Sequence, residues 1–470
     1  MLGVLRPMST IRTSVQSLRR AVVHRLADLG SPLVGNARVA SLTAALRPRA
    51  DRLAFALAVG GIVLSGYAQG ALRVVVSLPA WLGASQVVVV QAAVACVTLS
   101  AMFGLSGLAL LAKFRGAETP LPEHGPTVTA VVPVYGDATV LHRSVESLLA
   151  SRYRDLRVAI VTEPDDEESI ARARTFAADH DRVELLVNTD SPGSKAGAVN
   201  YAASVTDGQY LAVFDADERV APAFVSSAVA RLDDGCDVVQ GRTIPEPDGL
   251  IETVAYYESV VLGDLSRRLT SLLTDFTMAA SRTVVMHRQA FETVGGYDTG
   301  MLTEDYDFAF ACYEAGLSVA EQFAHASIIE AAHTATDWWG QRKRWMTGYA
   351  QVLHRLVGRC RSPTGYRSLV APAICAGSVF GNLFMLSLVP KAAVLVVAGT
   401  LAWLWLPVTT LAGTALAVRL HDVVYGRIES IGVGYLLLPA ILPVYSLAGI
   451  KAVVEYLLTW EGEWYSVAKG

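Results

Sequence analysis

A short apolar run ends in two carboxylates in the segment Tyr210-Leu211-Ala212-Val213-Phe214-Asp215-Ala216-Asp217. Similar β-rich runs recur between Pro120 and about Ala335, and helical patterns such as 141–150 and 167–179 separate them. The other runs are Val128–Val134, Arg157–Thr162, Val183–Val187 and Val238–Gly241. This alternation predicts an α/β fold with a mainly parallel sheet and helices on both of its faces.

The two carboxylates at the end of this run indicate a ligand site. Ligands of open α/β sheets bind beyond the carboxyl ends of the strands, and side chains two residues apart on a strand point the same way. Asp215 and Asp217 can therefore face one ligand, and their hard oxygens suit Mg²⁺ or Mn²⁺. An Asp-x-Asp pair alone is equally compatible with a solvated strand end.

The composition of the 470 residues points to a membrane. Hydrophobic residues make up 52% and charged residues 17% of the chain, whereas a soluble domain carries roughly 25% charged residues. These values exclude a disordered chain, a basic nucleic-acid binder and a simple soluble globule. The net charge of −4 implies no global electrostatic role, and five cysteines without a CxxC pair argue against a disulfide framework or a zinc site.

The apolar residues gather toward the two ends of the chain. Segments near 53–72 and 86–112, and later near 368–389, 392–414 and 431–456, are long enough to cross a bilayer. Buried core helices are the alternative. Because the first 52 residues hold nine arginines and two aspartates, the N-terminal arm is expected on the cytoplasmic side. Two crossings would then return the central domain to the cytoplasm, and the polar segment 419–429 would lie along the interface.

Two further motifs flank the Asp-x-Asp pair. Lys195 lies among small residues in Ser194–Asn200, where a loop-to-helix junction can meet a phosphate. Thr303 precedes a helical pattern that it is placed to cap, and Glu304 or Asp305 beside it could act as a general base. The alternatives are a surface lysine and acidic residues that merely favour a helix N-terminus.

The segment Asp337–Trp345 is the richest in chemistry. Gln341, Arg344 and Trp345 fall at i, i+3 and i+4, and therefore share one helical face. That face offers an amide, a guanidinium for phosphate and an indole for stacking on a sugar. The alternative is a basic and aromatic anchor helix at the membrane interface.

In this order and spacing the motifs resemble the processive family 2 glycosyltransferases, which include cellulose, hyaluronan and chitin synthases. The resemblance covers about residues 128–351 and implies a GT-A fold. It rests on an Asp-x-Asp pair, a Thr-Glu-Asp motif and a Gln-x-x-Arg-Trp motif, together with three supporting segments. The matching segments are Val131–Tyr135, Ser194–Asn200, Asp215–Asp217, Gly295–Asp298, Thr303–Asp305 and Gln341–Trp345.

The resemblance implies an inverting, metal-dependent transfer from a nucleotide-sugar, expected to be a UDP-sugar, to a growing saccharide. It assigns the general base to Asp305 with Glu304 as the second candidate, and the contact with the acceptor sugar to Trp345. Asp217 and Asp215 are expected to ligate Mg²⁺ or Mn²⁺. The nucleotide and its diphosphate are expected to contact Pro133, Tyr135, Glu163, Lys195, Asp215, Gln341 and Arg344.

Two departures from the family pattern stand out. The second strand of the family ends in an Asp-Asp pair that contacts the base, whereas here Glu163 occupies that position. The tail Trp464–Gly470, with Trp464 and Lys469, is similar to a degenerate gating motif; an amphipathic tail is the alternative. A gating tail must be cytoplasmic, which conflicts with five crossings that start inside, unless one apolar segment does not cross or two crossings are merged.

The expected organisation is a basic arm, two membrane helices, a catalytic domain, an interfacial amphipathic helix, C-terminal membrane helices and a tail. Their ranges are 1–52, 53–112, 118–336, 337–362, 368–458 and 459–470. The expected partners are a nucleotide-sugar, a saccharide or lipid-linked acceptor and the bilayer, without nucleic acid; an export partner is left open. A non-processive glycolipid synthase and a transporter or scaffold with an inactive domain are the alternatives.

Overall fold

The computed structural model describes residues 51–64, 86–114, 121–359, 365–462 and 465. The chain divides into two units, Met1–Ala54 and Phe55–Gly470. In the first unit only residues 51–54 are described, and they are helical. All that follows concerns the second unit.

The described residues of this unit contain a seven-stranded sheet with the strand order β3-β2-β1-β4-β6-β5-β7. The strands are β1 (Val128–Val134), β2 (Leu156–Thr162), β3 (Val183–Val187), β4 (Tyr210–Val213), β5 (Val238–Pro245), β6 (Val284–His287) and β7 (Val319–Ile329). All neighbouring pairs are parallel except those of β6, which runs antiparallel to β4 and to β5. The predicted mainly parallel α/β sheet is confirmed, and β6 and β7 are strands that the sequence patterns did not indicate.

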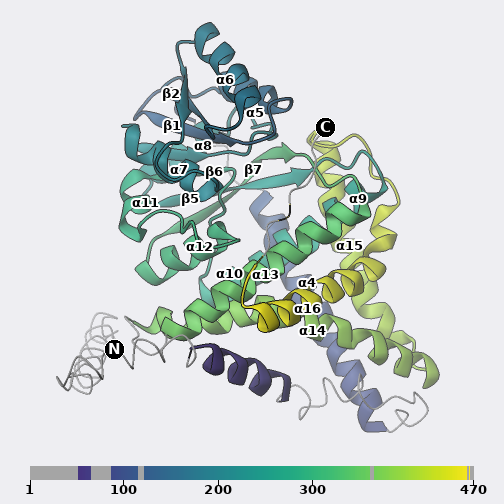
Figure 1. The fold of residues 1–470 in the computed structure, drawn as a ribbon. Coiled ribbons are helices and arrows are strands. Elements are labelled where there is room, and N and C mark those ends of the chain that lie inside the picture. Colours follow the sequence, from purple (N-terminus) through teal and green to yellow (C-terminus); the bar gives the residue numbers. More distant parts are fainter. Residues whose placement is uncertain (1–50, 65–85, 115–120, 360–364, 463–464, 466–470) are drawn as a thin grey trace, which may run out of the picture. The chain divides into compact units, whose positions relative to one another are not determined.

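Helices cover both faces of the sheet (Figure 1). Val128, Ala130 and Val132 of β1 belong to one buried core, whereas Val131 belongs to the other. This alternation follows from the twofold period of a strand, and burial on both faces explains why β1 is apolar apart from Thr129. The covering helices are α5 (Leu141–Leu149), α6 (Glu167–Asp179), α7 (Lys195–Val205), α8 (Phe224–Asp233), α11 (Arg288–Val294) and α12 (Glu304–Ala315).

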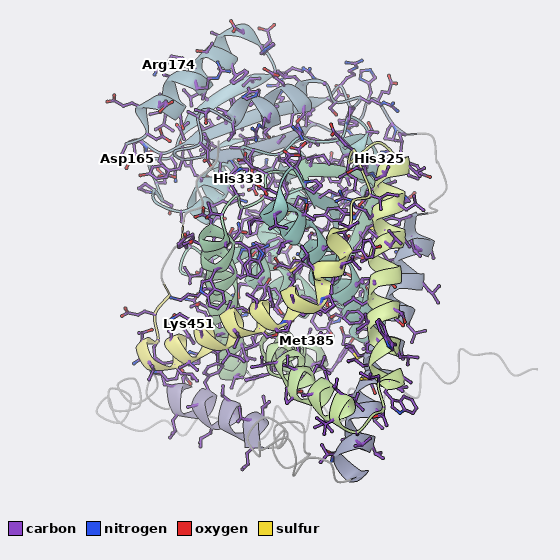
Figure 2. All side chains as sticks on the ribbon, turned by 90° about the vertical axis from the view of Figure 1, so that its right-hand side faces the viewer. Asp165, Arg174, His325, His333, Met385 and Lys451 are labelled. Carbon is purple, nitrogen blue, oxygen red and sulfur yellow. The ribbon has the colours of Figure 1, made fainter. Side chains whose placement is uncertain are left out.

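A second helical layer packs against the sheet domain (Figures 1 and 2). It consists of α4 (Gln86–Phe114), α9 (Leu250–Glu258), the π-helix η3 (Ser259–Leu265), α10 (Ser266–Thr274), α13 (Ala335–Arg359), α14 (Tyr366–Val397), α15 (Ala402–Val424), η4 (Gly434–Leu437) and α16 (Leu438–Thr459). Helix α13 contacts α12 of the sheet domain, and it also contacts α9, α14 and α16. The segment 337–362, predicted to be an interfacial amphipathic helix, is therefore packed between the sheet domain and the apolar helices.

Among the described residues, three helices are long and apolar enough to cross a membrane: Val88–Phe114, Ala402–Val424 and Gly434–Thr459. Tyr366–Gly381 and Met385–Val397, which meet at 49°, would make a fourth if they form one span. The boundary expected near residue 390 lies inside α14, and the chain turns instead around Gly399, whose φ of +69° favours glycine. The second half of the segment 53–72 lies outside the described residues.

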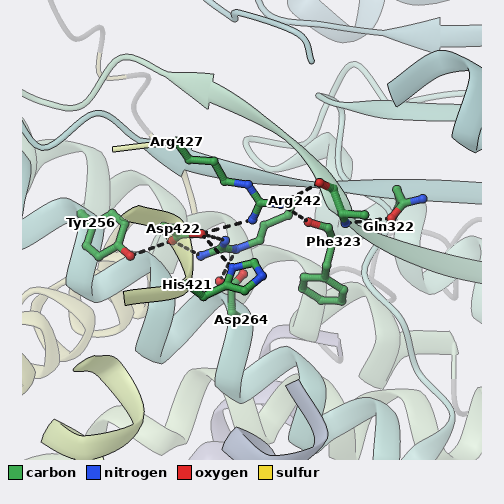
Figure 3. A network of polar contacts seen from close by, with 9 residues as sticks. Arg242, Tyr256, Asp264, Gln322, Phe323, His421, Asp422 and Arg427 are labelled. Atoms are coloured by element: carbon green, nitrogen blue, oxygen red, sulfur yellow. Dashed lines mark hydrogen bonds and ion pairs between the residues drawn. The ribbon is translucent and has the colours of Figure 1, made fainter. Parts of the chain in front are cut away.

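The segment 419–429, expected to lie along the interface, begins inside α15 and takes part in a buried ion network (Figure 3). The Arg242 guanidinium of β5 contacts Asp264 of η3 at 2.7 Å and Asp422 of α15 at 2.6 and 2.9 Å. Tyr256 of α9 donates its hydroxyl hydrogen to Asp422 at 2.7 Å. Arg427 joins Asp422 at 3.2 Å and donates to the Ala324 carbonyl of β7 at 2.6 Å. The network therefore ties an apolar helix to two strands of the sheet.

Candidate active site

The Asp-x-Asp pair follows β4 at the carboxyl edge of the sheet, as the strand pattern predicted. The Asp215 carboxylate forms an ion pair with Lys195 and lies 3.7 Å from the Arg282 guanidinium. Asp217 is buried, with 6% of its surface exposed. Lys195 is the first residue of α7, and the Ser194 hydroxyl caps that helix by accepting the Gly197 N–H at 3.0 Å.

Glu218 supports this turn and was not singled out by the sequence patterns. Its side chain is fully buried, accepts the backbone N–H of Asp215 at 3.2 Å and accepts the hydroxyl of Thr283. Burial raises the pKa of Glu218 to about 7. Its place in the sequence, directly after the Asp-x-Asp pair and among apolar residues, could have indicated a structural role. A carboxylate buried in apolar surroundings is costly unless hydrogen bonds support it.

The two aspartates offer a partial site for a divalent cation. Among the described residues no three His, Cys, Asp or Glu side chains gather in a way that could hold a metal ion. Two carboxylates nevertheless suit a cation whose remaining ligands come from substrate phosphates and water. The residues present therefore fit a cation that binds together with its substrate.

Three of the expected nucleotide-binding residues, Pro133, Tyr135 and Glu163, lie at the ends of β1 and β2. Glu163 accepts the Asn188 side-chain amide at 3.0 Å and the Gly193 N–H at 2.8 Å, so both of its oxygens hold the loop that leads into α7. Tyr135 is 63% exposed, and its hydroxyl lies 3.4 Å from Asp165. Pro133 pairs with Val161 in the β1–β2 ladder. A contact between these residues and a nucleotide stays a prediction.

The acidic residues Glu304 and Asp305 begin α12. Thr303 occupies the predicted N-cap position, but its side chain makes no capping hydrogen bond, so that part of the expectation is wrong. Glu304 is buried and accepts the Ser281 hydroxyl at 3.0 Å. Burial, followed by the charge of Asp305, raises the pKa of Glu304 to about 7. Asp305 is half-buried and accepts its neighbour's N–H, that of Tyr306, at 2.8 Å.

Arg344 on α13 lies in the electrostatic field of these acids. Burial lowers the pKa of Arg344, while the charges of Glu304, Asp305 and Asp215 act in the opposite direction. The charge of Lys195 also acts on Glu304. The structure thus brings Asp215, Lys195, Glu304, Asp305 and Arg344 into one charged cluster.

A cavity of about 500 Å³ opens beside this cluster. Arg282 belongs to both, because it lines the cavity and also lies 3.7 Å from Asp215. Gln341 and Trp345 line the same cavity, which continues between α4, α14 and α16. The residues from these three helices include Leu99, Met102, Phe103, Ser378, Met385, Leu442, Tyr445 and Ser446. No sequence motif indicated Arg282 as a site residue.

The tail residues Trp464 and Lys469 lie outside the described residues. Tyr465 between them is described, and its hydroxyl donates to Asp337 at 3.0 Å. Its ring also packs on Gly340, where an added Cβ would lie 2.5 Å from the ring. One residue of the tail therefore contacts the helix that carries Gln341 and Trp345.

Residues 125–348 match the family model described as "Glycosyltransferase like family 2". "Cellulose synthase 1 catalytic subunit [UDP-forming]" of Komagataeibacter xylinus is 24% identical over 68% of this chain and 43% of its own length. "Cellulose synthase 1" of the same organism is 27% identical over 53% of this chain and 17% of its own length. "Beta-monoglucosyldiacylglycerol synthase" of Trichormus variabilis is 23% identical over 53% of this chain and 55% of its own length.

The chain therefore spans less than two thirds of each of these curated relatives. Among solved structures, the mannosyltransferase PcManGT of Pyrobaculum calidifontis, in complex with GDP-Man and Mn²⁺, is 18% identical. The similarity has a TM-score of 0.49 and covers 77% of this chain and 99% of the mannosyltransferase.

Proposed function

We propose that this chain is a membrane-bound, inverting glycosyltransferase, because residues 125–348 match the model "Glycosyltransferase like family 2" and contain a mostly parallel sheet. It transfers a sugar from a UDP-sugar to a growing saccharide. One observation carries the proposal: the charged cluster around Asp215 meets, at Arg282, a cavity that Trp345 lines. Donor and acceptor thus have adjoining places.

The donor binds at the charged cluster. Asp217 and Asp215 would hold a divalent cation, Mg²⁺ or Mn²⁺, which would supply positive charge against the diphosphate of the donor. Lys195, Arg282 and Arg344 supply the additional positive charge that a leaving nucleoside diphosphate requires. Pro133, Tyr135, Glu163 and Gln341 complete the nucleotide contacts.

Asp305 is the general base. It takes the proton of an acceptor hydroxyl while that oxygen bonds to the anomeric carbon of the donor, and the bond from that carbon to the diphosphate oxygen breaks. A single displacement inverts the anomeric configuration. Asp305 suits this role better than Glu304, because Asp305 is half-buried, whereas Glu304 is buried and accepts the Ser281 hydroxyl.

The cavity supports a saccharide acceptor. Its lining combines aromatic rings, which stack on sugar faces, with hydroxyl groups that exchange hydrogen bonds with sugars. The aromatic residues include Tyr306, Trp345, Tyr349 and Tyr445, and the hydroxyl residues include Ser266, Thr270, Ser378 and Ser446. Three apolar helices adjoin this region, so we place the protein in the plasma membrane as a multi-pass protein. By the positive-inside rule its catalytic domain faces the cytoplasm.

A lipid acceptor is the second candidate. The cavity also carries an apolar stretch, formed by Leu99, Met102 and Phe103 of α4 with Met385 and Leu442, which would accommodate acyl or prenyl chains. One relative is named a beta-monoglucosyldiacylglycerol synthase, and this name favours a lipid as the alternative acceptor.

Radiolabelled UDP- and GDP-sugars offered to the purified chain, in lipid and with Mg²⁺ or Mn²⁺, test the proposal. We expect label in material that elutes early in gel filtration and stays in the aqueous phase on solvent extraction. Label that moves to the organic phase would favour the lipid acceptor. Absence of nucleoside diphosphate release with every donor would refute the proposed activity.

A further inference from the structure

A buried ion pair lies in the cavity wall, at two residues to which the proposed function gives no role. Arg342 of α13 and Glu258 of α9 are 4% and 3% exposed. The Arg342 Nε lies 2.7 and 2.8 Å from the two Glu258 oxygens, and Nη2 lies 2.6 Å from one of them. The Trp338 indole N–H also donates to Glu258 at 2.6 Å. The carboxylate is thus fully engaged by two side chains of α13.

The far side of the guanidinium holds two residues that line the cavity. Its Nη1 donates to the Gln341 side-chain oxygen, and its central carbon lies 4.5 Å from the centre of the Trp345 ring. The Trp338 ring lies 5.4 Å away. A guanidinium over an indole face is attractive and directional. Arg342 therefore connects one buried carboxylate with both Gln341 and Trp345.

Stability alone does not explain such a pair. Burying two charges costs desolvation that their attraction roughly offsets, and well-packed apolar residues often do as well or better. What an apolar pair cannot provide is a fixed planar fork that orients an amide on one edge and an indole on its face. Side chains that touch substrate need this kind of support to hold their productive geometry.

Glu258 lies where two helices meet. It is the last residue of α9, and the π-helix η3 begins at the next residue. Ser259, Gly263 and Asp264 of η3 line the cavity. Isolated π-turns inside helices occur frequently at functional sites. The same carboxylate therefore joins this part of the cavity wall to Trp345.

We propose that the Glu258–Arg342 pair is a positioning device that sets the Trp345 indole toward the acceptor. The proposal rests on the proposed function, because it requires Trp345 to meet the acceptor. Both residues act through others, so their loss should reduce acceptor use without reducing donor use.

Glu258→Gln and Arg342→Lys test this in the full-length protein. Each keeps a similar shape but breaks the charged fork. We expect transfer to the acceptor to fall about 10-fold or more, in line with the effect of small misplacements at reacting groups. The acceptor KM should rise, while UDP affinity and donor hydrolysis stay within about twofold of wild type. In a Trp345→Ala background, Glu258→Gln should have little further effect, because coupled residues are not additive.

Asp422→Asn is the control, since it also removes a buried carboxylate from Arg242, but Asp422 does not line the cavity. It should lower the thermal midpoint without changing the ratio of transfer to hydrolysis. Equal loss of transfer and hydrolysis in Glu258→Gln, or additive effects with Trp345→Ala, would overturn the positioning role. A wild-type protein that transfers no sugar would instead overturn the proposed function. If Glu258→Gln loses UDP binding, the ratio of transfer to hydrolysis in Arg342→Lys tests the positioning role instead. Loss of UDP binding in both variants would mean that the pair is purely structural and the proposal wrong.

Discussion

At the scale of single residues, Asp217 has the sharpest proposed role. It is buried at the end of β4, close in sequence to the ion pair of Asp215 with Lys195. Asp217→Asn keeps the shape but removes a charged oxygen ligand. We expect loss of turnover and of metal-dependent UDP binding, with unchanged thermal stability without metal. Titration of UDP with and without Mn²⁺ measures this, and full activity in EDTA would contradict the metal assignment.

The adjacent acids Glu304 and Asp305 should respond differently to substitution. Asp305→Asn cannot accept a proton, so turnover should fall by about 10²–10⁴-fold, the usual contribution of a general base. UDP affinity should survive, because the proposed donor contacts lie on other residues. Glu304→Gln is the control and should lower turnover less. If Asp305→Asn retains more than about a tenth of the turnover, the base is another carboxylate, with Glu304 the first candidate.

Glu304 also predicts a pH dependence of stability. Its pKa of about 7 in the folded chain lies above the ordinary value of 4.5. The folded state therefore holds a proton that the unfolded state has lost, and this stabilisation disappears as the pH rises from about 4.5 to about 7. Glu304→Gln keeps a neutral side chain, so it should be more stable than wild type near pH 8, by up to about 3 kcal/mol. The gain should vanish near pH 4.5. Thermal midpoints at both pH values measure it, and an equal difference at both would contradict the assignment.

At the scale of elements, α12 and α13 meet at a glycine. A Cβ on Gly348 would lie 2.5 Å from the Thr303 side chain, directly before Glu304 and Asp305. Gly348→Ala should separate the two helices and cost about 1–3 kcal/mol, as overpacking does, and it should lower turnover as well. Gly358→Ala on the same helix is the control, because a Cβ there meets nothing within 4 Å. The control should be neutral or gain up to about 1 kcal/mol from helix propensity. Equal midpoints for the two variants would refute the contact.

The elements also show how far the sequence alone could go. The first five strands were predictable because β1, β2 and their neighbours are apolar runs between clear helical patterns. β6 was missed because its apolar run, Val284-Val285-Met286, is only three residues long and leads almost directly into α11. β7 was missed because polar residues interrupt it, as in Ala320-Glu321-Gln322-Phe323. The turn at Gly399 was missed because the apolar run extends on both sides of it, so composition alone cannot mark where one helix ends.

The candidate site divides in the same way. Asp215, Asp217, Lys195, Asp305, Arg344 and Trp345 lie in local motifs, and their local pattern sufficed to select them. Glu258 and Arg282 lie in no motif, and they meet Arg342 and Asp215 only through the packing of distant segments. Such partners become visible only when the tertiary structure is known, since a buried ion pair has no sequence period.

At the scale of the whole molecule, the network around Asp422 joins an apolar helix to the catalytic sheet (Figure 3). Asp422 is fully buried and accepts from Arg242, Tyr256 and Arg427. Removing one partner from a buried ion pair leaves an uncompensated charge. The attachment of α15 to β5 and β7 therefore depends on this carboxylate.

Asp422→Asn should accordingly cost about 3–5 kcal/mol, the usual effect of breaking a buried pair. Arg427→Lys should cost less, because the lysine ammonium keeps the positive charge beside Asp422. Some stability is still lost, because an ammonium cannot reach both Asp422 and the Ala324 carbonyl as the guanidinium does. Thermal midpoints of the lipid-embedded protein should fall in that order, while the donor KM of the remaining folded enzyme stays near wild type, because the network contacts none of the donor residues. A donor KM that rises with Asp422→Asn at unchanged midpoint would mean that the network shapes the donor site instead of holding α15 to the sheet.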